Sequence, residues 1–484
     1  ISDSTITITN PTSNGILATN IQGSATISAN QGSQVTTTTA NAGILLAESL
    51  GTINLTGLEV NSTNGAALVG TTINNATILD STLTSINSST NGISLNGISG
   101  IVDISNSTIT ITNPLDNING ISVSNVTGTV NIAANEGSQI TQANQGIELF
   151  DATGAIAISG FDIRNTDDSG ISGINLGNVT LANNRIEGAT NEGIYLADTD
   201  GEVTISQNSI INIIGVEDPD PTTSLDFPTG QGILLNNVTG SVQVSLNTIS
   251  GTMGFKPGFP ILPSGQGIVI NNDTGSVNIT LSDNSLFDNY EDAILIGLGV
   301  PIGNPMVNLT IEGNIIENNG GSNPTRGDGI GIGIEGGTTI ENLTISGNAI
   351  RNNGDEGIDI RLGLVQVFNS TAEIKQAIIE NNTIENNRQQ GIEFQLFDET
   401  KVFANILDNT LTTPNDYIGV KVTTTNNSAF CLNLSDNTSN TGFSLIQDPL
   451  SSSIFEILSE TQNILDANQS GTITLDTPNG LPCP

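Results

Sequence analysis

Acidic side chains and scarce basic ones gather in two similar segments in the second half of the chain. Gly357-Ile-Asp-Ile-Arg361 and Gly391-Ile-Glu-Phe-Gln395 alternate apolar and polar residues, a pattern typical of strands with one buried face. The alternation turns Asp359, Arg361 and Glu393 outward, and the repeat predicts that Asp359 lies directly above Glu393. Carboxylates about 5 Å apart on adjacent strands repel each other unless a cation bridges them. These segments therefore predict a Ca²⁺ site, with oxygen ligands of the kind that this ion prefers.

Other charged residues lie near this pair. Glu356 precedes the first segment and is a further candidate for ligand binding. Arg361, Lys375 and Arg388 are the candidate bases, because cation-assisted proton abstraction from a sugar acid needs a basic group beside the ion. The alternative interpretation is an ion-paired face in solvent that binds nothing.

Two further motifs could contact a ligand. The acidic loop containing Glu217, Asp218 and Asp220 is a candidate cation contact without a defined ligand pattern. The tripeptide Arg326-Gly-Asp328 has the sequence of a receptor-binding loop, but so short a motif is weak evidence in a chain rich in Gly and Asp.

The composition excludes several classes of function. The chain has no His, so mechanisms that need an imidazole base or ligand are ruled out. Asp and Glu total 48 against 10 Lys and Arg, and the net charge of −38 disfavours nucleic acid and anionic membranes as partners. No run approaches the roughly 18 apolar residues of a membrane-spanning helix. We expect an extracellular or cell-surface protein.

The two cysteines are both close to the C-terminus. Cys431 and Cys483 predict one disulfide that staples the last coils in an oxidising compartment. Two free thiols are the alternative.

Two short elements recur along the whole chain and predict its fold. A tetrad Gly-Ile-x-(Leu/Ile/Val) starts near Gly15 and returns through Gly65 and Gly173 to Gly442, and an alternating strand ending in Asn precedes most copies. Such strands bury their inner face only by stacking coil on coil. The sequence therefore predicts an all-β, right-handed parallel β-helix of about 16 coils.

The repeated asparagines are expected to form a hydrogen-bonded ladder at one corner of the coils. The alternative is that each merely tolerates left-handed turn geometry. The predicted ladder consists of Asn184, Asn208, Asn247, Asn284, Asn314, Asn348, Asn382, Asn409 and Asn437.

A longer repeat divides the chain. Residues 1–11 recur almost unchanged as residues 104–114, and later segments match at a similar offset. We expect a regular, duplicated shaft over 1–200, coils with loop insertions over 201–430, and C-terminal coils with a cap over 431–484. The insertions, at 214–230, 252–265, 297–306, 319–327 and 361–374, would stack into the wall of a groove.

Residue 1 falls inside a predicted coil, which leaves open strand edges. Such edges pair readily with another chain. The expected partners are further β-helix of the same polypeptide or other copies of this chain.

These repeats resemble those of the pectate-lyase-like superfamily of parallel β-helix proteins, over essentially the whole chain. The resemblance implies the fold and leaves the activity open, because members include polysaccharide lyases as well as phage tailspikes and bacterial surface adhesins. Gly-His-Gly motifs of the galacturonan hydrolases cannot be present without His. The favoured interpretation is a noncatalytic, adhesive stalk or fibre segment, with polysaccharide as a further partner, and the alternative is a Ca²⁺-dependent polyuronate lyase.

Overall fold

The chain divides into two compact units, Ile1–Val216 and Glu217–Pro484, and each is considered by itself. The boundary falls within the first predicted insertion. The computed structural model describes residues 6–9, 14–30, 33–39, 41–114, 117–215, 230–254, 265–273, 275–299, 305–321, 327–363, 370–447 and 454–457. Within these ranges the regular structure is β-strand, and none of them contains a helix able to cross a membrane.

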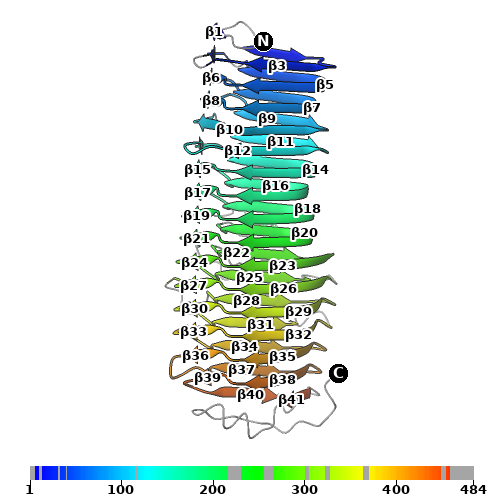
Figure 1. Ribbon diagram of the computed structural model, residues 1–484. Helices are drawn as coiled ribbons and strands as arrows, with labels where there is room; N and C mark the ends of the chain where they lie inside the picture. The colour runs from blue at the N-terminus through cyan, green and yellow to red at the C-terminus, as the bar shows by residue number, and fades with distance from the viewer. Residues whose placement is uncertain are drawn as a thin grey trace. The chain divides into compact units, whose positions relative to one another are not determined.

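Each unit is a parallel β-helix whose coils contribute strands to three faces, as the sequence predicts (Figure 1). Within each unit, strands pair in parallel with the equivalent strands of adjacent coils. On the first face of the second unit, for example, Ile294 pairs with Ile330, and Ile330 with Ile358. These isoleucines are fully buried, so the inner faces form the core.

In the first unit, long strands cover the first and second faces together. These are β5 (Ile44–Thr56), β7 (Leu68–Leu79), β14 (Ile147–Ser159), β16 (Ile171–Ala182) and β18 (Ile194–Ser206). The first face also contains β2 (Ile16–Thr19), β9 (Ile93–Ile98) and β11 (Ile121–Val126), and the second contains β3 (Ser24–Ser28) and β12 (Thr129–Ala134). The third face is made by β1 (Thr7–Thr9), β4 (Gln34–Thr37), β6 (Glu59–Thr63), β8 (Thr82–Ile86), β13 (Gln139–Thr141), β15 (Asp162–Arg164), β17 (Arg185–Glu187) and β19 (Ser209–Ile211), while β10 (Ile101–Thr112) covers the second and third.

In the second unit β20 (Ile233–Ser245) covers two faces and the later strands are separate. The first face contains β22 (Ile268–Asn272), β25 (Ile294–Leu298), β28 (Ile330–Ile334), β31 (Ile358–Leu362), β34 (Ile392–Leu396), β37 (Val420–Thr424) and β40 (Phe443–Gln447). The second contains β23 (Ser276–Ser282), β26 (Met306–Glu312), β29 (Thr339–Ser346), β32 (Glu373–Glu380), β35 (Lys401–Leu407), β38 (Ala429–Ser435) and β41 (Ile454–Ile457). The third contains β21 (Thr248–Ser250), β24 (Ser285–Phe287), β27 (Ile315–Glu317), β30 (Ala349–Arg351), β33 (Thr383–Glu385), β36 (Thr410–Thr412) and β39 (Thr438–Ser439).

The tetrad glycine lies where backbone and core crowd together. At Gly329 a Cβ atom would lie 2.4 Å from Cγ2 of Ile350 and 2.6 Å from the carbonyl oxygen of Gly357. No side chain fits at that distance, so glycine is required there. The predicted start of the first-face strand was wrong in two coils. These strands begin after Ala67 and Gly170 rather than after Gly65 and Gly173.

The two copies of the sequence repeat have equivalent strand pairings in the first unit. Thr7 pairs with Gln34, and Thr110 of the second copy pairs with Gln139. The next coils repeat the match, because Gln34 pairs with Glu59 and Gln139 with Asp162.

The asparagine ladder is present in both units. In the first, Nδ2 of Asn184 donates to Oδ1 of Asn208 at 3.2 Å. In the second, each Nδ2 donates to the next Oδ1 at 2.9–3.0 Å, and the backbone N–H of the same residue donates to that oxygen as well. The second ladder runs through Asn247, Asn284, Asn314, Asn348, Asn382, Asn409 and Asn437.

Left-handed geometry does not explain these asparagines. The positive φ belongs to the residue before each one, such as Asp283 before Asn284 and Asn381 before Asn382. That residue makes the turn, and the asparagine after it is buried and bonds along the stack.

Two related columns were not predicted. Asn289, Asn319, Asn353 and Asn387 form a second buried ladder, with Nδ2 to Oδ1 distances of 2.9 Å. In the first unit serines accept equivalent bonds, because the N–H of Ser81 donates to Oγ of Ser107 at 3.2 Å and the N–H of Ile109 donates to Oγ of Ser138 at 2.9 Å.

Replacing a buried ladder residue should destabilise the second unit far more than replacing an exposed asparagine of the same coil. Asn348→Ala leaves the two N–H donors of Asn314 and the carbonyl of Ile311 without their partner. We expect a loss of about 3 kcal/mol in the free energy of unfolding, measured by urea denaturation. The control, Asn342→Ala, removes an exposed amide and should change stability by about 0.5 kcal/mol at most. Equal losses in the two variants would contradict a structural role for the buried ladder.

Candidate functional site

The outer side of the first face in the second unit carries a column of charged residues. Gly331 of β28 pairs with Asp359 of β31, Asp359 with Glu393 of β34, and Glu393 with Lys421 of β37. Asp359 and Glu393 therefore lie one above the other, as predicted.

These two carboxyl groups are buried although they occupy outward positions. Asp359 and Glu393 are each 3% exposed. The guanidinium of Arg361 lies against Oδ2 of Asp359, and Nζ of Lys421 lies 2.7 Å from Oε1 of Glu393. The face is ion-paired, as the alternative interpretation expected, but its two carboxyl groups are buried while Arg361 and Lys421 remain partly exposed.

A second set of acids comes from the corner that precedes the first-face strands. Asp292, Asp328 and Glu356 each stand directly before the Gly or Ala of a tetrad. The backbone N–H of Asp328 donates to Oδ1 of Asp292 at 2.8 Å, and the N–H of Glu356 donates to Oδ1 of Asp328 at 3.1 Å. Sequence reasoning identified only Glu356, although the tetrad would have aligned all three.

The corner and the strand column meet at three carboxyl groups. One oxygen each from Asp328, Glu356 and Asp359 lies within 4.8 Å of the other two. Oε2 of Glu356 and Oδ1 of Asp359 are buried and, among the residues that the structure describes, have no hydrogen-bond partner. These three residues are the set that could hold a metal ion.

The electrostatics of this cluster favour protonation of the carboxyl groups or binding of a cation. Burial raises the pKa of Asp328, Glu356 and Asp359, and the neighbouring carboxylates raise each pKa further. Arg361 opposes this at Asp359, where its charge lowers the pKa. Two separate negative charges cannot lie so close in a desolvated site without compensation.

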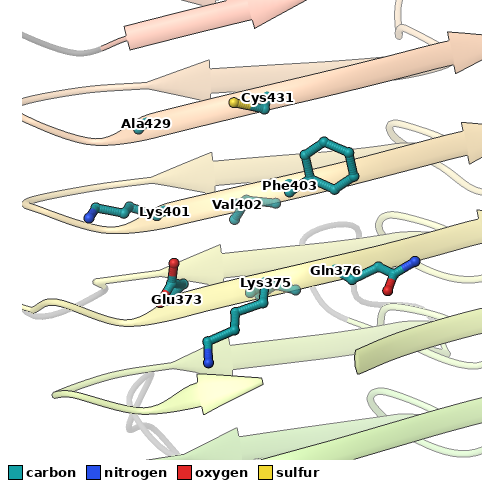
Figure 2. A pocket seen from close by; sticks show the side chains of 9 residues that line it. Glu373, Lys375, Gln376, Lys401, Val402, Phe403, Ala429 and Cys431 are labelled. Atoms are coloured by element: carbon teal, nitrogen blue, oxygen red, sulfur yellow. The ribbon is translucent and has the colours of Figure 1, made fainter. Parts of the chain in front are cut away.

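The other two predicted bases contact different groups. Lys375 lies on β32, on the second face, with Nζ 2.7 Å from Oε1 of Glu341. It lines a pocket of about 520 Å³ together with Lys401, Phe403 and Cys431 (Figure 2). Nη2 of Arg388 donates to the carbonyl of Gly321 at 3.3 Å.

The remaining predicted residues are only partly described. Glu217, Asp218 and Asp220 lie outside the described residues, as do Arg326 and most of the inserted loops. Cys431 is disulfide-bonded, whereas Cys483, its expected partner, lies outside the described residues.

Comparison with known proteins adds a structural likeness. No protein-family model and no curated protein matches the chain. The crystal structure of the Dettilon tailspike protein is similar at a TM-score of 0.36 and 16% identity, over 72% of this chain and 61% of that one. The chain thus spans less than two thirds of the tailspike chain.

The first unit has an acid at the equivalent corner position, without the three converging carboxyl groups of the cluster among its described residues. Glu192 also stands directly before a tetrad glycine, and Oγ of Ser169 donates to its Oε2 at 2.8 Å. Burial raises the pKa of Glu192 to about 7; the hydrogen bond from Ser169 opposes this shift, and the charge of Asp168 adds to it.

This shift predicts a pH-dependent stability of the first unit. Because the folded pKa lies above the unfolded value of 4.5, the protonated form favours folding, and stability falls as the pH rises from about 4.5 to about 7. Glu192→Gln removes this titration. The free energy of unfolding of the variant minus that of the native chain should therefore increase by about 3 kcal/mol as the pH rises over that interval. Urea denaturation at several pH values measures the difference, with the exposed Glu136→Gln as control. Parallel pH curves for Glu192→Gln and the native chain would contradict the shift.

Proposed function

We propose that this chain is a noncatalytic structural segment of an extracellular or bacterial cell-surface protein, a stalk or fibre segment that can also adhere to glycans. The observation that carries the proposal is the ladder from Asn247 to Asn437, which ties consecutive coils of the second unit together without interruption. Backbone pairing on three faces and buried amide columns together make a stiff support.

The covalent and electrostatic properties support an extracellular setting. A disulfide at Cys431 is of a kind that persists in oxidising compartments. A net charge of −38 keeps such a chain soluble and separates it from nucleic acid.

The arrangement of basic groups argues against the lyase alternative. A proton-abstracting base needs a lowered pKa. The hydrogen bond to Glu341 raises the pKa of Lys375, and at Arg361 the surrounding carboxylates outweigh the lowering effect of burial and raise the pKa. Both groups are thus held as cations.

The catalytic alternative has a direct assay. Incubation with pectate and with alginate, with and without Ca²⁺, should release no unsaturated uronate, because neither charged base can accept a proton. Absorbance of the unsaturated product measures the reaction. Release of unsaturated uronate that requires Ca²⁺ and is lost in Arg361→Ala would contradict our proposal and favour the lyase. Lys375→Ala, on the second face, is the control and should then keep the activity.

The expected partners can be tested independently of catalysis. A stalk or fibre segment that pairs with other copies of itself should form longer particles as its concentration increases, because unsatisfied strand edges pair with one another. Electron microscopy across a concentration series measures the particle length. Isolated short particles at every concentration would contradict self-assembly.

A further inference from the structure

We propose that Asp328, Glu356 and Asp359 bind one Ca²⁺ ion, which links two adjacent coils of the second unit. Asp328 precedes β28, whereas Glu356 and Asp359 belong to the coil of β31, so the ion would join neighbouring coils by their side chains. The inference concerns stability and does not depend on the proposed structural role.

The first support is the shortage of positive charge. Six carboxyl groups lie in this region, from Asp292, Asp328, Asp355, Glu356, Asp359 and Glu393. Arg361 pairs with Asp359, and Lys421 pairs with Glu393. The amide of Gln389 donates to Asp355. The described partners therefore leave most of the negative charge at the three converging carboxyls uncompensated.

The second support is the pair of unpartnered oxygens. Glu356 and Asp359 are each 97% buried, and one oxygen of each has no hydrogen-bond partner within the described ranges. A buried carboxylate oxygen without a donor is costly. Because one oxygen each from Glu356, Asp359 and Asp328 lies within 4.8 Å of the other two, a single ion can contact all three residues.

The third support is the space that Gly331 provides. Cδ1 of Leu295 lies 3.3 Å and Oδ2 of Asp328 lies 3.4 Å from where a Cβ of Gly331 would be, so both side chains border the outer side of the strand at that position. Gly331 is also the register partner of Asp359. We expect a β-branched side chain there to crowd both Leu295 and Asp328 and so to move Asp328 relative to the other two acids.

The chemistry of the set selects the ion. Three hard oxygen ligands without Cys or His favour Ca²⁺ or Mg²⁺ over Zn²⁺. Separations of up to 4.8 Å suit metal–oxygen distances of about 2.3–2.6 Å better than the shorter, strictly octahedral distances of Mg²⁺. A site of this charge count is expected to have a Kd on the order of 10⁻⁴ M, in the range of extracellular calcium modules.

Calcium titration of the whole chain tests the proposal. In about 0.15 M NaCl, which screens weak surface binding, calorimetry should show one saturable Ca²⁺ site and a weaker response to Mg²⁺. The thermal unfolding midpoint should rise with Ca²⁺ and return when a chelator is added. Absence of both effects in the native chain would overturn the proposal.

Variants then assign the site. Glu356→Gln and Asp359→Asn should each weaken binding by about tenfold or more, because each removes a charged ligand. Glu192→Gln is the matched control, since Glu192 occupies the same corner position in the other unit, where Asp168 is near but no third acid converges among the described residues, and this variant should bind Ca²⁺ like the native chain. Unchanged affinity in the two ligand variants would place the ion elsewhere and overturn the assignment.

A variant that keeps every carboxyl group separates ligand loss from misfolding. Gly331→Val should weaken Ca²⁺ binding by displacing Asp328, while the unfolding midpoint without Ca²⁺ shows that the chain still folds. Native affinity in a folded Gly331→Val chain would contradict the geometry proposed here.

Discussion

The constraint on which the structure depends is that the polar groups buried at each corner must find partners along the stack. A coil of this size turns sharply, and a residue of positive φ such as Asp283 turns the chain before the ladder. Oδ1 of the following asparagine, Asn284, then accepts from the backbone N–H and from the side-chain amide of Asn247 at once. Because one missing member would leave two donors unpaired on one side and an acceptor without its side-chain donor on the other, these columns fix the register of adjacent coils.

A fixed register stacks groups that repel each other as strictly as groups that bond to each other. The outward positions of β31 and β34 bring Asp359 above Glu393, although equal charges at this spacing repel. Lys421 and Arg361 offset part of this cost on the same face. The acidic cluster is thus a consequence of the coil register combined with acids at two positions, the strand and the corner before it.

The sequence predicted the features that repeat and missed those that depend on neighbours. Period-two alternation and the Asn turn predicted the coils, the ladder and the contact between Asp359 and Glu393. The second ladder had a signal, since Asn289 and Asn319 each follow a first-ladder asparagine by five residues, but it was not recognised. The burial of Asp359 had none, because an outward position on an alternating strand is ordinarily exposed. Lys375 and Arg388 were grouped with the cluster by their place in the sequence, whereas a coil of about 30 residues separates sequence neighbours onto different faces.

The corner position before the tetrad shows why the acids there need a counterion. Gln145 and Gln266 occupy it elsewhere, and their neutral amides donate to carboxylates at 3.0 and 3.1 Å. Their carbonyl oxygens have no hydrogen-bond partner among the described residues, but the amide side chains are neutral and place no net charge in the stack. Asp292, Asp328 and Glu356 are three consecutive acids at this position, and the backbone N–H bonds between them compensate one oxygen of each of the first two. Oε2 of Glu356 has no such hydrogen-bond donor within the described residues. The carboxyl group of Asp359, which belongs to the strand, lies beside the carboxyl group of Glu356. A positive partner at this meeting point would relieve the repulsion on both coils, which is why the geometry favours an ion shared between coils over one bound by a single loop.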